Sequence, residues 1–564
     1  MSGVEPERQK IIIKGGQLKD DQDLSKLGIK PNHQFMLIGT ASGTAAIQKP
    51  KEQIKFLEDM TAAEVAQSDG AVPAGLQNLG NTCYLNSTLQ TLRAIPELQT
   101  ELQTYKSSSS AGEVDLSQFG LSGLGASNDI PASLRDLYKQ MGTTQDGFPP
   151  MMFLNAFRTA YPQFAEQTRD GHGYAQQDAE EAWSQIITSL RQKLKVSKDS
   201  TSPDAIGEAS RETQLGFIDR YMGGTFTRVE ECDDPAAVEA GEKPGTKADE
   251  PFFKLDCHVA EREILHLNQG ITAALTNTYT KTSPTLGHEA DYTSRSKISR
   301  LPKYLPVHFV RFFWKKAINK KSKILRKVTF PFELDVTEDC SDELRKMLLP
   351  VRDKLRDLRK QELDVERARK RQKRFDDGAE PEAAPSFKAK GPASETALAK
   401  DKKAATGSNG DTTMKDADAE AEKFKTDADL AAERAAAILA AKKDVLSAVN
   451  PELLRDAGAC QTGLYELRGV ITHQGASADS GHYMSYVKKS ATAKPKPGGK
   501  AKIDDDKTDN GWWLFNDEKV SEVDEERILA LAGGGESASA LVLLYAAVPL
   551  PELTAEEKEM EGKA

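Results

Sequence analysis

Cysteine is scarce in this sequence, and long apolar runs are absent. Five cysteines in 564 residues are too few for a disulfide scaffold. No stretch approaches the roughly 18 consecutive apolar residues that a membrane span needs. The first residues, MSGVEPERQK, also lack the basic and apolar regions of a signal peptide. We therefore expect a reducing compartment, cytoplasmic or nuclear, and no membrane partner.

Positive charge and apolar residues are also in short supply. The chain has 76 Lys and Arg against 86 Asp and Glu, which gives a net charge of −10. A general nucleic-acid binder needs a basic face, so we expect no nucleic-acid partner. Hydrophobic residues make up 38% of the chain and its mean hydropathy is −0.55, a low apolar content for a globular chain. This shortage predicts that part of the chain does not join a core.

Composition changes divide the chain into two domains. Residues 8–40 alternate short apolar runs with turns, which predicts two strands with a short helical turn between them. Polar residues at 43–72 predict a linker, and a denser apolar pattern then occupies 73–548. The tail, 549–564, is acidic. We expect one large domain preceded by a much smaller one.

The large domain carries a charged insertion at 341–460. At its start, 341–374 has charges at helical spacing, and 421–448 contains strong helix formers and predicts a helix, whereas 376–420 has almost no aromatic residues. That middle part cannot bury enough apolar area to offset the entropy of ordering, so we predict that it is disordered. A second interruption, 489–510, is rich in Lys, Gly, Pro and Asp and predicts a flexible loop.

The most informative segment is 75–90, GLQNLGNTCYLNSTLQ, a glycine-rich turn that continues as a helix. Its leucines recur at helical spacing and predict one buried stripe: Leu85, Leu89 and Leu92. Asn81 or Thr82 is the expected N-cap, so Cys83 falls in the first helical turn. The first turn favours negative charge, so we expect the pKa of Cys83 to fall and its thiolate to serve as a nucleophile. The alternative is a small buried hydrophobic side chain, the role of most free cysteines.

A nucleophilic cysteine needs a base and an orienting group from elsewhere in the chain. His482 is the best candidate for the base, because it opens an expected strand after the small-residue loop of 469–487, GVITHQGASADSGHYMSYV. The strand end WWLFND then offers Asn516 and Asp517, either of which could hold the imidazole in the productive tautomer. His473 is a competitor, but it precedes the loop, and we expect a structural role for it.

These two segments resemble the cysteine and histidine boxes of the ubiquitin-specific proteases, and they occur in the family's order. GYAQQDAEEAW at 173–183 and YLPVHFVRFF at 304–313 are similar to two further family boxes. Within the family, the chain is most similar to the proteasome-associated branch of ubiquitin carboxyl-terminal hydrolases 6 and 14. That similarity is carried by 281–313, by the THQGASADSGHY loop and by the turn LALAGGGE at 529–536.

The resemblance implies an α+β fold, the papain-like cysteine protease with the family's fingers, palm and thumb, over 73–548. It also implies that 1–42 is part of a β-grasp ubiquitin-like domain, because RQKIIIKGGQLKDDQDL fits the branch's domain. The match begins near the end of that domain's helix, so its N-terminal half is expected to be missing. Either the start codon is misassigned or the domain is truncated, and a truncated domain would weaken docking on the 26S proteasome regulatory particle.

By resemblance, Cys83 is the nucleophile, His482 is its base and acid, and Asn516 orients the imidazole. Asn516 is the match because the family's third residue directly follows an aromatic at a strand end, where many members have Asp. Asn78, five residues before the nucleophile, matches the family's hydrogen-bond donor to the oxyanion. The implied reaction is thiol-dependent hydrolysis of the peptide or isopeptide bond at the ubiquitin C-terminal glycine, which recycles ubiquitin from proteasome-bound substrates.

The resemblance assigns substrate binding to Gln177, Asp178, Glu181 and Tyr483. The alternative for 176–181 is a solvated helix start, because acidic side chains suit a first turn. Loops at 278–297 and 474–481 match two loops that cover the ubiquitin-tail channel in the free enzymes of this branch. This match implies low activity until ubiquitin or the proteasome moves those loops.

The paired CxxC zinc sites of many family members do not occur in this sequence. Cys232 and Cys257 stand alone, so we expect no metal and no other cofactor. The expected partners are ubiquitin, ubiquitinated proteins and the proteasome, and the expected location is the cytoplasm and nucleus, on the proteasome. The basic run at 367–374 is either a nuclear-localisation signal or a charged helix face.

Two other functions are alternatives to a deubiquitinating enzyme. One is a non-catalytic regulator that binds ubiquitin or the proteasome, and the presence of Asn78, Cys83, His482 and Asn516 argues against it. The other is a papain-like peptidase of general substrates, and the ubiquitin-directed boxes argue against that.

Overall fold

The structure is a computed structural model of the chain, and it falls into two compact units, Met1–Val65 and Ala66–Ala564. The residues that it describes are 10–13, 16–18, 36–38, 60–68, 71–107, 129–168, 173–195, 216–260, 264–315, 320–376, 427–477, 480–492 and 511–554. The predictions made for 377–420, 493–510 and 555–564 lie outside the described residues.

The smaller unit contains a three-stranded antiparallel sheet in the order β2-β1-β3. Its strands are β1 (Lys10–Ile13), β2 (Gly16–Gln17) and β3 (Met36–Ile38). β1 and β3 match the two strands expected within 8–40, β2 was not expected, and the helical turn expected between them lies outside the described residues. A short helix, α1 (Ala62–Ala66), ends the predicted linker.

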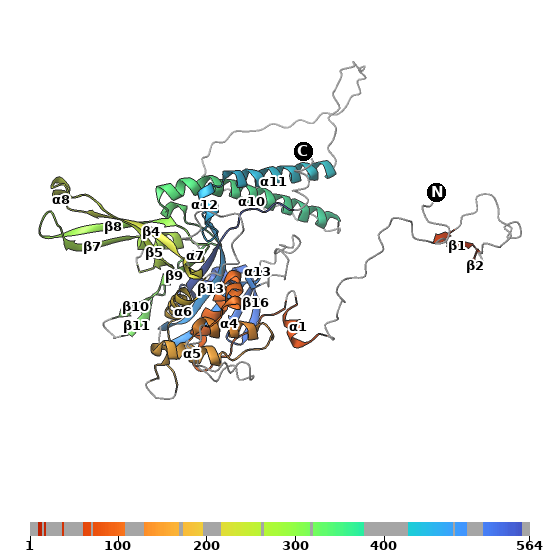
Figure 1. Cartoon of the computed structure of the whole chain (residues 1–564), viewed down its shortest axis with the longest axis horizontal. Coiled ribbons are helices and arrows are strands. Elements are labelled where there is room, and N and C mark those ends of the chain that lie inside the picture. The colour runs from red at the N-terminus through yellow and green to blue at the C-terminus, as the bar shows by residue number, and fades with distance from the viewer. Residues whose placement is uncertain are drawn as a thin grey trace, which may run out of the picture. The chain divides into compact units, whose positions relative to one another are not determined.

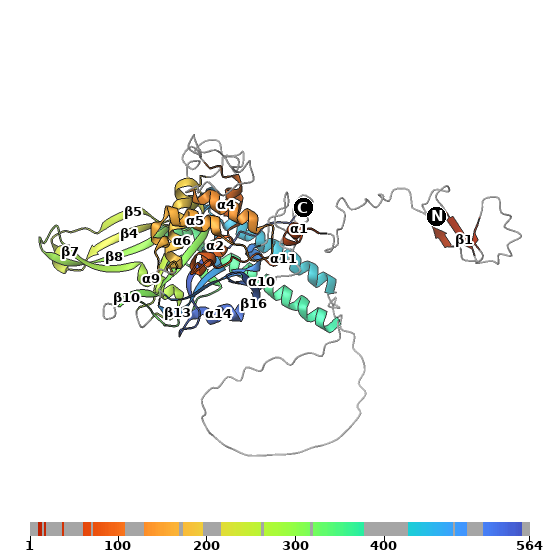
Figure 2. The ribbon, with the colours of Figure 1, turned by 90° about the horizontal axis from the view of Figure 1, so that it is seen from below.

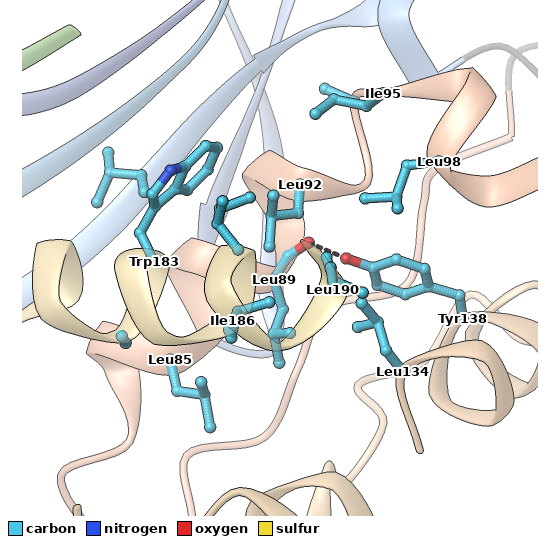
Figure 3. Close-up of a cluster of buried hydrophobic side chains, with 14 of the residues drawn as sticks. Leu85, Leu89, Leu92, Ile95, Leu98, Leu134, Tyr138, Trp183, Ile186 and Leu190 are labelled. Atoms are coloured by element: carbon cyan, nitrogen blue, oxygen red, sulfur yellow. Dashed lines mark hydrogen bonds between the residues drawn. The ribbon is translucent and has the colours of Figure 1, made fainter. Parts of the chain in front are cut away.

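The larger unit begins with helices that surround α2 (Cys83–Leu92), every residue of which is buried. The neighbouring helices are α3 (Pro96–Thr104), α4 (Ile130–Met141), α5 (Met151–Ala160), the 3-10 helix η5 (Pro162–Ala165), α6 (Ala179–Lys193) and α7 (Phe217–Tyr221). Leu85, Leu89 and Leu92 lie in the core between these helices, so the predicted stripe is confirmed (Figure 3). The Tyr138 hydroxyl donates a hydrogen bond to Leu89 O at 2.8 Å, which ties α4 to α2 (Figure 3).

A ten-stranded sheet follows, with the path β16-β15-β14-β13-β17-β9-β6, to which β12 and the β10–β11 hairpin add alongside β13. Its strands are β6 (Leu255–His258), β9 (Tyr304–Val310), β10 (Phe312–Lys315), β11 (Lys320–Lys323), β12 (Glu333–Asp335), β13 (Leu464–Ser477), β14 (Ser480–Lys488), β15 (Trp512–Asn516), β16 (Lys519–Val523) and β17 (Ser539–Ala547). Apolar side chains occupy both faces of β17, and nearly all of its residues are buried, as a central strand requires. The strand end expected at WWLFND is confirmed by β15.

A second, four-stranded antiparallel sheet extends away from the helices in the order β5-β4-β8-β7 (Figures 1 and 2). Its elements are β4 (Gly224–Cys232), α8 (Pro235–Glu239), β5 (Gly245–Phe252), α9 (Leu267–Ala274), β7 (Thr276–Thr282) and β8 (Glu289–Arg300). β7 pairs with β8 along its whole length, so the prediction that 278–297 is a loop is wrong, while its covering role stays a prediction. Burial alternates along β8, and its Thr, Tyr and Ile side chains suit a strand, which is why this segment forms a hairpin.

The ends of the predicted insertion form two helices that run side by side, α10 (Asp342–Asp376) and α11 (Asp427–Ala448) (Figures 1 and 2). They share an apolar cluster with the end of the large sheet: Val351, Leu355, Leu358, Val445, Val449, Leu464 and Val548. Arg359 of α10 also pairs with Glu333 of β12 at 2.6 Å. The two predicted helices are therefore confirmed, and they pack on the domain.

The remaining short elements are η8 (Thr337–Asp339), α12 (Pro451–Arg455), α13 (Lys489–Thr492), α14 (Glu525–Leu529) and η9 (Ala530–Ala532). Helices and sheets occupy separate parts of the larger unit, which confirms the α+β class. None of the helices in the described ranges is both long and apolar enough to span a membrane.

Candidate active site

Cys83 is the first residue of α2, and the chain approaches it through a tight turn. Gly80 and Asn81 have φ angles of 95° and 53°, in the left-handed region. Thr82 is the N-cap, and its carbonyl accepts hydrogen bonds from the backbone N–H groups of Leu85 and Asn86. The expected helix start is therefore confirmed, and Cys83 lies where unpaired N–H groups of the helix gather.

The Cys83 thiol is almost fully buried, with 3% of the residue exposed. Burial raises the pKa of Cys83 to about 11, although the backbone N–H groups of Tyr483 and Tyr84 oppose the rise; the negative charge of Asp517 adds to it. The prediction of a lowered pKa is wrong for this structure, because desolvation of the thiolate outweighs the effect of the helix N-terminus. The thiol is thus protonated at neutral pH.

His482 lies at the start of β14, and Asn516 ends the adjacent strand β15. Their side chains are joined by a hydrogen bond of 2.6 Å between His482 Nε2 and Asn516 Oδ1. An amide oxygen only accepts, so Nε2 carries the proton and Nδ1 is left to act as a base. The neighbouring backbone N–H of Tyr483 faces the Cys83 sulfur. The two boxes, about 400 residues apart in sequence, therefore meet at one place.

No hydrogen bond joins the His482 ring to the Cys83 thiol within the described part of the chain. Catalytic hydrogen bonds are often long or misaligned in free enzymes and shorten when substrate binds. Together with the protonated thiol, this geometry describes a resting site.

Asp517 contacts two amide side chains instead of the imidazole. Its Oδ2 accepts a hydrogen bond from Asn78 Nδ2 at 3.0 Å, and its Oδ1 accepts one from Asn86 Nδ2 at 2.8 Å. Of the two candidates for the orienting residue, the structure therefore brings Asn516 to His482 and gives Asp517 a different role. The sequence alone left this choice open because both residues follow the same strand.

Asn78 is held in one orientation from both ends of its amide. Its Oδ1 accepts hydrogen bonds from the backbone N–H groups of Gly80 and Thr82, both at 3.1 Å. Its Nδ2 donates to Asp517, which leaves a second N–H of the same nitrogen for another acceptor. A fixed N–H beside the nucleophile is the arrangement that an oxyanion hole needs.

The start of α6 lies against α2, because the Thr88 hydroxyl donates to Ala179 O at 3.3 Å. Asp178 is the N-cap of α6, and its Oδ1 accepts a hydrogen bond from the Glu180 backbone N–H at 2.9 Å. Gln177, Asp178 and Glu181 are half-buried. The helix-start interpretation of Asp178 is confirmed, and contact of the three side chains with a substrate stays a prediction.

Tyr483 differs from its predicted role in substrate binding. Its residue is 1% exposed, and its ring packs edge to face on His473 with 4.7 Å between ring centres. The structure therefore buries the Tyr483 ring, because strand alternation places the side chains of His482 and Tyr483 on opposite faces of β14. His473 is fully buried, and burial together with the charge of Lys323 lowers its pKa to about 3. A structural role for His473 fits this environment.

The segment 474–481 is the tip of the β13–β14 hairpin, with a bulge between Gln474 and Ser477. Two neighbours hold it. The Gly475 N–H donates to Glu536 O at 3.0 Å, and Ser477 pairs with Ser322 of β11. Sequence reasoning missed the β10–β11 hairpin as a neighbour of this segment.

No group of three or more His, Cys, Asp or Glu side chains is placed to hold a metal ion, as far as the described ranges extend. Cys257 is buried in a core cluster, and Cys232 is half-buried at the end of β4. The absence of a metal or cofactor stays a prediction.

The chain is similar to known proteins over most of its length. The family model described as ubiquitin carboxyl-terminal hydrolase matches 74–545, and that of the ubiquitin family matches 1–42. Ubiquitin carboxyl-terminal hydrolase 6 of Schizosaccharomyces pombe is 39% identical over 549 residues, which cover 97% of this chain and 92% of the relative. Ubiquitin carboxyl-terminal hydrolase 7 of Arabidopsis thaliana is 34% identical over 97% of this chain and 92% of its own. Ubiquitin carboxyl-terminal hydrolase 14 of Caenorhabditis elegans is 27% identical over 97% of this chain and 87% of its own length.

Proposed function

The chain belongs to the ubiquitin carboxyl-terminal hydrolase family and is a cysteine-type deubiquitinase, and on that premise we propose that Cys83, His482 and Asn516 are its catalytic triad. One observation carries this assignment. The histidine that opens β14 is hydrogen-bonded to Asn516 at 2.6 Å, and the next backbone N–H on that strand faces the Cys83 sulfur. A nucleophile, a base and an orienting group are thus gathered around one point.

The reaction begins with proton transfer from the Cys83 thiol to Nδ1 of His482. Because the thiol is protonated at rest, this transfer has to accompany the approach of substrate, when His482 closes on the sulfur. Asn516 keeps the ring in the required tautomer through its Oδ1. Being neutral, Asn516 stabilises the resulting imidazolium less than a carboxylate would.

The thiolate then attacks the carbonyl carbon of the ubiquitin C-terminal glycine, and the carbonyl oxygen becomes negatively charged. The second N–H of Asn78 Nδ2 and the backbone N–H of Cys83 stabilise that oxyanion. His482 gives its proton to the departing lysine amine, so the carbon–nitrogen bond breaks and a thioester remains. Water, deprotonated by His482, hydrolyses the thioester and restores the thiol.

The acidic start of α6 supplies binding to the ubiquitin tail. Glu181 lies in the first turn of α6, which packs directly on α2 through Ala179; Asp178 is the N-cap of α6 and Gln177 precedes it. Carboxylates there suit a basic peptide segment that must end at Cys83. Asp178 does this while its Oδ1 also caps α6.

The enzyme acts on ubiquitinated proteins at the proteasome, in the cytoplasm and nucleus. The ubiquitin-family match at 1–42 supports a docking module, and the relatives named ubiquitin carboxyl-terminal hydrolase 6 and 14 support the branch. Docking gives the enzyme its substrates by raising their local concentration.

The free enzyme has low activity. Its nucleophile is buried and protonated, and the hairpin tip at 474–477 next to the catalytic histidine is held by Glu536 and by β11. Movement of that tip, driven by ubiquitin or by the proteasome, opens the site.

The test is hydrolysis of ubiquitin–AMC by the full chain, alone and with 26S proteasome. We expect faster turnover with proteasome, and a fall of at least about 10³-fold in kcat for Cys83→Ala and His482→Ala. Cys232→Ala and His288→Ala are matched controls on the four-stranded sheet and retain activity. Equal rates with and without proteasome would contradict the low resting activity. Full activity of His482→Ala would contradict the triad.

A further inference from the structure

A polar pocket of about 350 Å³ adjoins the catalytic residues on the side of the β15–β16 turn. Its lining consists of Gln77, Asn78, Asn516, Asp517, Glu518 and Lys519. It therefore contains both the oxyanion donor and the residue that orients the imidazole.

The turn that forms the pocket wall has a fixed backbone. Asp517 has a φ of 51°, and its carbonyl accepts a hydrogen bond from the Leu76 N–H at 3.0 Å. A Cβ on Gly75 would come within 2.4 Å of Glu518 O, and one on Gly147 within 2.6 Å of Glu518 Cβ. Because Gly75 and Gly147 have no side chain, their backbones pack directly against the β15–β16 turn. The residues that follow them, Leu76 and Phe148, form a β-bridge. The position from which the Glu518 side chain extends is set by these contacts.

Glu518 is the carboxylate of this pocket that is available to a ligand. Asp517 is engaged by Asn78 and Asn86, whereas no hydrogen bond or ion pair engages the Glu518 carboxylate in the described part of the chain. Its residue is exposed, as is Lys519, the cation of the lining. Two amides, Gln77 and Asn78, complete a wall suited to extended peptide.

The two sides of the nucleophile carry different elements. The start of α6, to which the proposed function assigns the ubiquitin tail, packs on α2 through Thr88. The β15–β16 turn packs on the start of the same segment through Leu76 and Asn86. If the acyl chain lies along α6, the leaving group lies toward the turn, because the two substituents of the attacked carbonyl point apart.

We propose that this pocket binds the acceptor side of the substrate, the peptide that carries the ubiquitinated lysine, and that Glu518 selects acceptors with a basic residue beside that lysine. This inference rests on the proposed function. The side-chain amide of Gln77 contacts the acceptor backbone, and the carboxylate of Glu518 pairs with a flanking Arg or Lys. Being exposed, such a pair contributes a moderate preference that salt weakens.

The test uses ubiquitin joined by an isopeptide bond to a fluorescent peptide whose residue after the acceptor lysine is Arg, Ala or Glu. The full chain, with 26S proteasome, is used in excess over substrate in single turnovers, with ubiquitin–AMC as the substrate that lacks an acceptor peptide. We expect the Arg peptide to be cleaved about threefold faster than the Glu peptide, a difference typical of an exposed ion pair. Glu518→Lys reverses that order and leaves ubiquitin–AMC hydrolysis unchanged.

The matched control is Glu522→Lys, which makes the same charge change on β16 at a residue that pairs with Lys489 at 3.0 Å. It retains the wild-type order of peptides. Equal cleavage of the three peptides by the wild type, or an unchanged order in Glu518→Lys, would overturn the proposal. Loss of ubiquitin–AMC hydrolysis in Glu518→Lys would place the residue in catalysis and also overturn it. A wild type that cleaves none of these substrates would instead refute the proposed function.

Discussion

Asn78 donates a hydrogen bond from Nδ2 to Asp517 Oδ2 at 3.0 Å, although 439 positions separate the two residues in the chain. Asp517 thereby fixes the orientation of the amide that is proposed to stabilise the oxyanion. Since its other oxygen accepts from Asn86 in the buried middle of α2, the carboxylate also links the β15–β16 turn to the helix of the nucleophile. We therefore expect Asp517 to act as a positioning residue rather than as a member of the proposed triad.

Substitution of Asp517 tests this positioning role. We expect Asn78→Ala to lower kcat by about 10²- to 10³-fold and Asp517→Ala to lower it by a similar factor, with little change in KM. Because both changes remove one function, the double variant is no slower than the worse single variant. Steady-state hydrolysis of ubiquitin–AMC measures all three. Losses that multiply in the double variant would show that the two residues act independently.

The protonated state of Cys83 predicts how its alkylation depends on pH. With its pKa raised to about 11 by burial, the thiolate fraction at pH 8 is small and grows tenfold for each pH unit up to that value. We expect the rate of iodoacetamide labelling of Cys83 in the free enzyme to rise steadily from pH 7 to pH 10. Peptide mass spectrometry measures the rate at Cys83 separately from the other cysteines. A plateau reached by pH 8 would contradict the buried, protonated thiol.

The lowered pKa of the buried His473 predicts that the folded protein loses stability in acid. The His473 pKa is lowered to about 3 in the folded state, so the unfolded chain binds a proton at pH values where the folded chain does not. Stability is therefore complete above the ordinary histidine pKa and falls as the pH drops toward 3. We expect the change from pH 7.5 to pH 5 to destabilise the wild type by about 1–2 kcal/mol more than His473→Leu.

Urea unfolding at the two pH values measures this difference, and His288→Leu is the control, because His288 is exposed on the four-stranded sheet. That control keeps the wild-type pH dependence. The same acid loss in His473→Leu as in the wild type would show that other groups cause it.

Replacement of Arg311 is expected to lower the stability of the fold at a position away from the site. Arg311 is fully buried, and its guanidinium donates to the carbonyls of Ala540, Ile324, Arg326 and Ala532. Replacing it with Met leaves buried carbonyls without a donor, at a cost of about 3–5 kcal/mol. We expect the melting temperature of Arg311→Met to fall by several degrees, whereas Arg295→Met, an exposed site, changes it little. A melting temperature unchanged in Arg311→Met would contradict this role.

Helices and strands that depend on residues close together in the chain could be predicted from the sequence. The helix that starts at Cys83, its buried leucine stripe and the strand that opens at His482 all follow from spacing and turn residues, and all are found in the structure. The helices at both ends of the insertion are found as well. These features depend on neighbours within a few residues, which periodicity captures.

Features set by distant contacts were not predictable from the sequence. The raised pKa of Cys83 comes from burial by other elements of the fold. The local sequence around the helix N-terminus does not reveal that burial. The choice between Asn516 and Asp517 depends on which of them faces His482 across β14 and β15. The Gly, Ser and Thr content of 278–297 is common to loops and hairpins, so composition alone does not distinguish the β7–β8 hairpin from a loop.

The central claim is that Cys83 is the nucleophile that accepts ubiquitin. The most direct measurement treats the full chain, with 26S proteasome, with ubiquitin–vinyl sulfone and maps the adduct by peptide mass spectrometry. The account predicts a single ubiquitin adduct on the peptide that contains Cys83, retained in Cys232→Ala and lost in Cys83→Ala. An adduct on another cysteine, an adduct that persists in Cys83→Ala, or no adduct on the wild type would contradict it.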